Sequence, residues 1–129
     1  MSHNLQMIQS TYENSPQENA KNLKALLDEN SSWTEAAGFP YAGTYVGSDE
    51  IFTQVFRRLA TEWDAFQAKV HTYLADGDKV AAFGVYSGTY KQTGKAFEAA
   101  FAHLYHLKDG KIVTMQQIVD SALVNDALK

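Results

Sequence analysis

The feature that most constrains this chain is the dipeptide Asp109-Gly110, which separates two stretches rich in aromatic and β-branched residues. Asp-Gly tolerates the left-handed backbone of a two-residue hairpin turn, so the flanking stretches are predicted to pair as antiparallel strands, with Lys108 opposite Lys111. Because side chains alternate along a strand, this turn assigns a face to every residue of both strands. The chain is therefore predicted to end in a hairpin with two distinct faces.

Continued outward from the turn, this register gathers polar and aromatic side chains on one face. It pairs Leu107 with Ile112, Tyr105 with Thr114, His103 with Gln116, Phe101 with Ile118 and Ala99 with Asp120. A second turn at Thr93-Gly94 adds a third strand and sets Tyr86 beside Phe101. Rows of glycine and alanine lie between the bulky rows, whereas a face made only for packing would carry branched residues there. We therefore expect a pocket on this face.

Composition restricts the classes of protein and of site. With 129 residues, of which 45% are hydrophobic, the chain is predicted to be one folded domain over 1–129. A net charge of −4 disfavours nucleic acid and anionic membranes as partners. No apolar run approaches the roughly 20 residues of a membrane span, so we expect a cytoplasmic protein. There is no cysteine, the four histidines lack metal-ligand spacing and no phosphate-binding glycine loop occurs, so we expect neither metal nor cofactor.

The remaining elements follow from periodicity and capping signals. Residues 3–13 are predicted to form a weak helix, and Ser15, Pro16 and Glu18 form a capping box that starts a second helix. Residues 33–35 are expected to form a short strand, and 38–47 a loop rich in glycine and aromatic residues. Ser48 is expected to cap the strongest helix, and four strands follow at roughly 66–75, 79–91, 95–108 and 111–121. Helices followed by antiparallel strands define an α+β domain.

This order of elements resembles the nuclear transport factor 2-like superfamily, in particular its branch of SnoaL-like polyketide cyclases and ketosteroid isomerase-like proteins. The resemblance is carried by Trp33, by Gly43-Thr44-Tyr45-Val46-Gly47, by the helix through Phe56, by Gly84 to Thr89, and by Phe101 to Asp120. It implies a cone-shaped, curved, mixed but mostly antiparallel sheet wrapped around the N-terminal helices, with a hydrophobic cavity between them. It also implies a homodimer paired through the outer sheet face, where we expect Ala102, Leu104, Met115 and Val119.

Asp120 is the first candidate for chemistry. In a pocket lined by aromatic rings, loss of solvent would raise the pKa of this carboxyl group toward the range of a general base. The cyclases that this chain resembles use an acid on the last strand to remove a proton next to a carbonyl, and Asp120 occupies the matching position. The alternative interpretation is an aspartate that caps a helix beginning near Ser121, or one paired with a cation at the end of the sheet.

His103 and Tyr86 are the other catalytic candidates. His103 is a candidate acid, a donor to a developing enolate or an orienter of substrate, and the alternative is a histidine satisfied by Gln116 across the strand pair. Tyr86 is a candidate donor to a carbonyl oxygen, and the alternative is a core residue with its hydroxyl at the surface. In the predicted register Asp120 and His103 lie about 13 Å apart, so they would act at different places on one ligand.

The candidate substrate-binding wall is mostly aromatic. It consists of Trp33, Tyr41, Phe56, Trp63, Phe101, Tyr105, Gln116 and Ile118. Two functions then remain open. The first is a cofactor-independent isomerase, cyclase or dehydratase that acts on a small hydrophobic carbonyl compound with Asp120 as the base. The second is a non-catalytic ligand-binding or structural dimeric module of the same fold. A buried Asp120 without a basic partner favours the first, and an exposed one favours the second.

Overall fold

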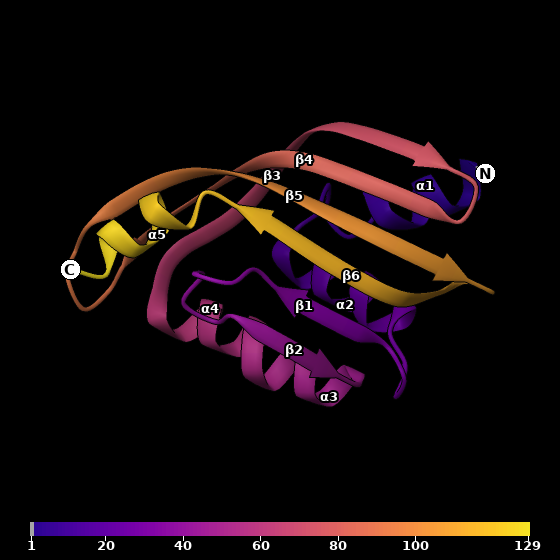
Figure 1. The fold of residues 1–129 in the computed structure, drawn as a ribbon, viewed down its shortest axis with the longest axis horizontal. Coiled ribbons are helices and arrows are strands. Elements are labelled where there is room, and N and C mark those ends of the chain that lie inside the picture. The colour runs from indigo at the N-terminus through magenta and orange to yellow at the C-terminus, as the bar shows by residue number, and fades with distance from the viewer. Residues whose placement is uncertain (1) are drawn as a thin grey trace.

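The computed structural model describes residues 2–129 as a strongly curved six-stranded sheet with helices against one face (Figure 1). The strand order is β2-β1-β6-β5-β4-β3; β1 runs parallel to β6 and the other neighbours are antiparallel. The elements are α1 Ser2–Gln9, α2 Pro16–Leu26, β1 Ser32–Glu35, β2 Gly43–Val46, α3 Ser48–Ile51, the π-helical turn η1 Phe52–Phe56, α4 Arg57–Glu62, β3 Trp63–Asp76, β4 Lys79–Tyr90, β5 Ala96–Lys108, β6 Lys111–Val119 and α5 Ser121–Ala127. The predicted α+β class and mixed curved sheet are confirmed.

The helices confirm some start signals and correct others. The Ser15 hydroxyl accepts the Glu18 N–H at 3.2 Å, which is the predicted cap of α2. Ser48 is instead the first helical residue of α3 behind Gly47, so the prediction of a Ser48 cap is wrong. The segment Gly43–Val46, predicted as loop, is an edge strand because it finds backbone partners on β1.

The β5–β6 hairpin begins as predicted and then departs from the predicted register. Lys108 pairs with Lys111 and Leu107 with Ile112, but His106 then pairs with Thr114, so Val113 is the extra residue of a β-bulge. Beyond the bulge every partner is displaced by one residue, and His103 lies opposite Gln117. Because side chains alternate, this displacement turns Met115 and Gln117 toward the helices and Gln116 and Ile118 outward.

The β4–β5 pairing differs from the prediction by two residues, which preserves the faces. Tyr86 lies opposite Ala99 and Gly84 opposite Phe101, because a wider loop at 91–94 replaces the predicted two-residue turn. Gly84 and Gly88 let the backbones of β4 and β3 lie close together, and they do not leave open space for a ligand. A Cβ atom at Gly84 would collide with the backbone carbonyl of Lys69, next to the irregularity of β3 between Val70 and Thr72.

Two hydrophobic clusters fill the inner face of the sheet, which is the face toward the helices. The larger joins α1, α2, α3 and η1 to the sheet through residues such as Ile8, Leu26, Val55, Tyr105 and Met115. The smaller lies where α5 packs on β5 and includes Phe101 and Val124. Within residues 2–129, no helix has the length and apolar character needed to cross a bilayer.

The outer face carries exposed apolar side chains, but not the set that was predicted. Leu104 is 43% exposed, and Ile118 and Leu74 are 63% and 62% exposed. Met115, predicted for this face, is only 1% exposed, because the bulge at Val113 turns it inward. Val119 packs against the smaller cluster instead.

Candidate active site

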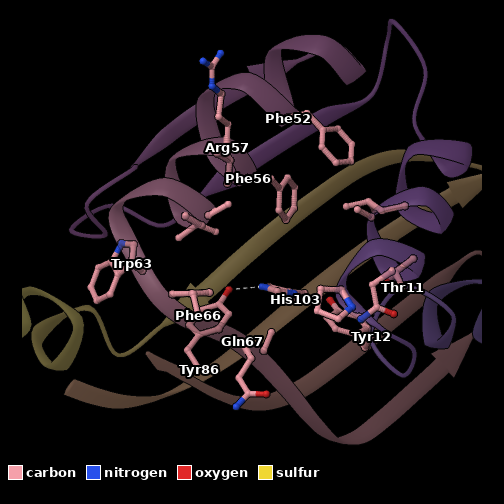
Figure 2. A pocket seen from close by; sticks show the side chains of 18 of the residues that line it. Thr11, Tyr12, Phe52, Phe56, Arg57, Trp63, Phe66, Gln67, Tyr86 and His103 are labelled. Carbon is pink, nitrogen blue, oxygen red and sulfur yellow. Dashed lines mark hydrogen bonds between the residues drawn. The ribbon is translucent and has the colours of Figure 1, made fainter. Parts of the chain in front are cut away.

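A cavity of about 830 Å³ opens between the helices and the inner face of the sheet (Figure 2). Its walls are largely aromatic and come from β1, from the α3–α4 helix and from the start of β3: Trp33, Phe52, Phe56, Leu59, Trp63 and Phe66. Its polar end is formed by Tyr12 after α1, Glu35 on β1, Tyr86 on β4, and His103 and Tyr105 on β5. Such a volume with few convergent polar groups is typical of a small-molecule site.

Glu35 is the buried acid of this cavity. It follows Trp33 by two residues on β1, so both side chains face inward, and Glu35 is only 4% exposed. Burial raises the pKa of the Glu35 carboxyl to about 7, although hydrogen bonds donated by Trp33 Nε1 at 3.0 Å and Gln117 Nε2 at 3.4 Å act in the opposite direction. Among the ion pairs formed within residues 2–129, none includes Glu35. The carboxyl group can therefore exchange a proton near neutral pH.

His103 lies at the centre of a chain of hydroxyl groups. Its Nδ1 lies 2.5 Å from the Tyr12 hydroxyl and its Nε2 lies 2.5 Å from the Tyr86 hydroxyl, the contact drawn in Figure 2. Tyr12 also contacts the Tyr105 hydroxyl at 2.5 Å. Burial lowers the pKa of His103 to about 3 and raises the pKa values of all three tyrosines. All four side chains of this hydrogen-bonded chain are therefore neutral near pH 7.

Proton counting in this chain leaves one donor over. A neutral His103 carries one N–H, and with three O–H groups the chain has four protons for the three contacts that join its members. One O–H is thus free to donate to another acceptor. Depending on the histidine tautomer and the direction of the Tyr12–Tyr105 contact, it belongs to Tyr86, Tyr105 or Tyr12. All four side chains line the cavity, so a ligand oxygen is a suitable acceptor.

Several predicted site residues do line the cavity. They are Trp33, Phe56, Trp63, Tyr86, His103 and Tyr105. Tyr41 and Phe101 are buried just behind it. Tyr41 donates to Glu62 and accepts from Trp63 Nε1 at 3.0 Å, while Phe101 stacks on the Tyr86 ring with centroids 4.1 Å apart. These two residues support the wall and do not form it.

Three predicted site residues lie outside the cavity. The bulge at Val113 places Gln116 and Ile118 on the outer face, where both are exposed. Asp120 is also exposed and occupies the N-cap position of α5, although its side chain makes no cap hydrogen bond. The predicted inward orientation of Asp120 is therefore wrong. The alternative, an aspartate that caps a helix, is correct for the position of Asp120 but not for the cap hydrogen bond.

Sequence reasoning missed Glu35, Gln117 and Tyr12. For Glu35 a signal was present, since a residue two positions after an inward-facing Trp33 on a strand shares its face. The predicted register places Gln117 on the outer face, and the prediction of a weak helix over 3–13 gives Tyr12 no role in a site. Within the part of the chain that the structure describes, no three His, Asp or Glu side chains converge as metal ligands.

Comparison with known proteins identifies the family. The sequence profile of the SnoaL-like domain matches residues 8–115. An NTF2-like protein from Burkholderia thailandensis is 41% identical with a TM-score of 0.92, over 98% of this chain and 97% of that one. TerC, co-crystallized with polyporic acid, is 20% identical with a TM-score of 0.83 over 97% of both chains. A putative SnoaL-like polyketide cyclase from Shewanella denitrificans is 13% identical with a TM-score of 0.79, over 99% and 98%. No functionally curated protein matches the sequence.

Proposed function

This chain belongs to the SnoaL-like family, and we propose that it is a cofactor-independent enzyme that moves a proton next to a carbonyl group, with Glu35 as the acid–base residue. The observation that carries the proposal is a buried carboxyl group that faces an apolar cavity of ligand size and has no cationic partner among residues 2–129. Glu35 takes the role that the sequence suggested for Asp120, which lies outside the cavity.

The reaction uses two polar systems at the same end of the cavity, the Glu35 carboxyl group and the chain of hydroxyl groups around His103. Ionised Glu35 takes a proton from the carbon beside the carbonyl, and the C–H electron pair moves into a carbon–carbon double bond while the carbonyl oxygen gains negative charge. The spare O–H of the Tyr12–His103–Tyr86–Tyr105 chain donates to that oxygen. Protonated Glu35 then returns the proton to another carbon, so the chemistry is balanced without a further reactant. A pKa of about 7 suits both directions of transfer.

The substrate class follows from the cavity walls. Trp33, Phe52, Phe56 and Phe66 present aromatic surface, which favours a flat hydrophobic molecule with its carbonyl at the polar end. Two fold relatives support small-molecule binding. One is TerC, co-crystallized with polyporic acid, and the other is a protein with a ketosteroid isomerase-like fold from Catenulispora acidiphila in complex with trimethylamine.

A homodimer is the second part of the proposal. The outer face brings Leu74, Phe83, Leu104 and Ile118 into neighbouring positions on four strands, and three of them are at least 43% exposed. An apolar patch of this kind is typical of an interface. We therefore propose that two copies pair through this face, which leaves both cavities open on the inner side.

Deuterium exchange tests the proposed chemistry directly. Bicyclic ketones, including α-tetralone, are screened by thermal shift, and each ligand that binds is incubated with protein in D₂O while NMR follows deuterium entering beside the carbonyl. We expect wild-type protein to accelerate exchange, Glu35→Gln to bind but lose the acceleration, and Asp120→Asn to behave as wild type. Binding without faster exchange, or loss of exchange in Asp120→Asn alone, would overturn the proposal.

A further inference from the structure

Gln117 on β6 is a buried amide that lies behind the cavity wall and connects its two polar systems. It is 4% exposed and does not line the cavity. Its Oε1 accepts the backbone N–H of Ala36 at 2.9 Å. Its Nε2 donates to the Tyr86 hydroxyl at 2.8 Å and toward Glu35 Oε1 at 3.4 Å. All the usual hydrogen-bonding groups of this side chain therefore have partners within the site.

The contact with Ala36 fixes which end of the amide points where. A backbone N–H can only donate, so the atom that faces it must be the amide oxygen. The NH₂ end is then directed at Glu35 and Tyr86, and both can accept from it. Ala36 also follows Glu35 directly in the chain, so Gln117 holds the backbone beside the acid as well as its carboxyl group.

We propose that Gln117 is a positioning residue that holds the Glu35 carboxyl group and the Tyr86 hydroxyl at a fixed separation for proton transfer. The inference rests on the proposed function, because it assigns Glu35 and the tyrosine chain to one reaction. Through the NH₂ group of one planar amide, Gln117 contacts both the base and the oxygen-binding chain. The Gln117 N–H that is directed at Glu35 also stabilises the ionised form of that carboxyl group, since a donor favours a carboxylate over a carboxylic acid.

The surroundings of Glu35 leave few other groups to set its ionisation. Trp33 on β1 donates to it, and the titratable groups facing it are Tyr86 on β4 and Tyr105 on β5. Neither tyrosine ionises near neutral pH, because burial raises both pKa values. Removal of the Gln117 donor should therefore register directly in the titration of Glu35.

The test measures the pKa of Glu35 by carbon-13 NMR of its carboxyl group, with Glu35→Gln used for assignment. In Gln117→Leu we expect this pKa to rise by about one unit, the size expected for loss of one hydrogen bond to a charged group. Gln117→Glu keeps the acceptor for Ala36 and replaces the donor with a second acid, so it should shift the pKa in the same direction even where Gln117→Leu folds poorly. Gln116→Leu, an exposed glutamine on the same strand, is the matched control and should leave the pKa in place.

The pH dependence of ketone exchange provides the second readout. On the acid side of the pH profile, the pH at which the exchange rate is half-maximal should rise with the Glu35 pKa in both Gln117 variants. Loss of a residue that supports only stability would lower the amount of folded protein without moving this midpoint. A Glu35 pKa that is equal in wild type, Gln117→Leu and Gln117→Glu would overturn the positioning role while leaving the proposed function standing. A wild-type Glu35 that titrates near 4.5 would overturn the proposed function itself.

Discussion

The two faces of the sheet carry side chains that are opposite to what their surroundings favour. The inner face, which packs against helices, holds an acid, a histidine and an amide that are each no more than 6% exposed. The outer face holds Leu74, Leu104 and Ile118 with 43% to 63% exposure. Burial of polar groups and exposure of large apolar ones both cost stability, so each face indicates a function beyond folding. The inner face fits ligand chemistry, and the outer face fits a partner.

The largest expected effect is on the inner face, where His103 makes the free energy of unfolding depend on pH. Its folded pKa of about 3 lies below its ordinary value of 6.5, so the folded state binds fewer protons than the unfolded one and stability falls as pH drops from about 6.5 to 3. The full loss is about 5 kcal/mol at 1.36 kcal/mol per pKa unit. His103→Gln cannot titrate, so urea unfolding at pH 7.5 and pH 4 should give a smaller difference than in wild type.

The matched control for His103 is the exposed His71 on β3. His71→Gln should retain the wild-type loss of stability between pH 7.5 and pH 4. An equal loss in wild type and His103→Gln would contradict the assignment of a buried, neutral histidine.

The second effect has the opposite sign and comes from Glu35. Its folded pKa of about 7 lies above its ordinary value of 4.5, so the folded state retains a proton that the unfolded state releases, and stability falls as pH rises from about 4.5 to 7. Glu35→Gln removes this loss. In urea unfolding the variant should exceed wild type by about 3 kcal/mol at pH 8, with most of that gain absent at pH 4.

Glu98→Gln, an exposed acid on β5, is the control for this measurement and should show no such gain at pH 8. A Glu35→Gln variant that is equally destabilised at both pH values would mean that Glu35 is held as a structural hydrogen-bond acceptor instead.

A smaller effect is expected on the outer face, where a substitution should change dimer association. Ile118→Lys places a charge within the proposed interface, on its β6 side, and we expect it to weaken dimer association at least ~10-fold while leaving the cavity residues of the inner face unchanged. Light scattering coupled to size exclusion measures the mass over a range of concentrations. Val46→Lys, an exposed apolar residue of β2, is the control and should retain the wild-type mass. A wild-type protein that is monomeric at every concentration would refute the interface.

The smallest effect is expected for Asp120→Asn. This side chain is exposed and makes no cap hydrogen bond, so the change should alter the free energy of unfolding by no more than about 0.5 kcal/mol. Urea unfolding at pH 7 measures it. A loss of several kcal/mol would show that Asp120 has a partner in solution that its exposure does not suggest.

The sequence predicted the parts of this structure that depend on neighbouring residues. Asp109-Gly110 forms the hairpin turn, with left-handed backbone at both residues, and Ser15 caps α2 as expected. Extrapolation from that turn failed at Val113, because one bulge residue inverts the face of every later side chain on β6. On β4 the register moved by two residues, an even number, so Tyr86 and His103 kept their predicted face.

The site itself depends on contacts between distant segments. Glu35 meets Gln117 because β1 runs parallel beside β6, and no local pattern predicts which strand a four-residue segment will join. Tyr12 reaches His103 across 91 positions of the chain. These pairings appear only once the sheet has curved around the helices.

Direct titration of Glu35 tests the central claim more sharply than any variant alone. Carbon-13 NMR of the wild-type protein, with the Glu35 carboxyl resonance identified by its loss in Glu35→Gln, gives the pKa without any substrate. A midpoint near pH 7 is the predicted result and makes Glu35 an acid–base group at neutral pH. A midpoint near 4.5, the ordinary value for glutamate, would mean that solvent or a cation reaches this carboxyl group, and it would contradict the proposed chemistry.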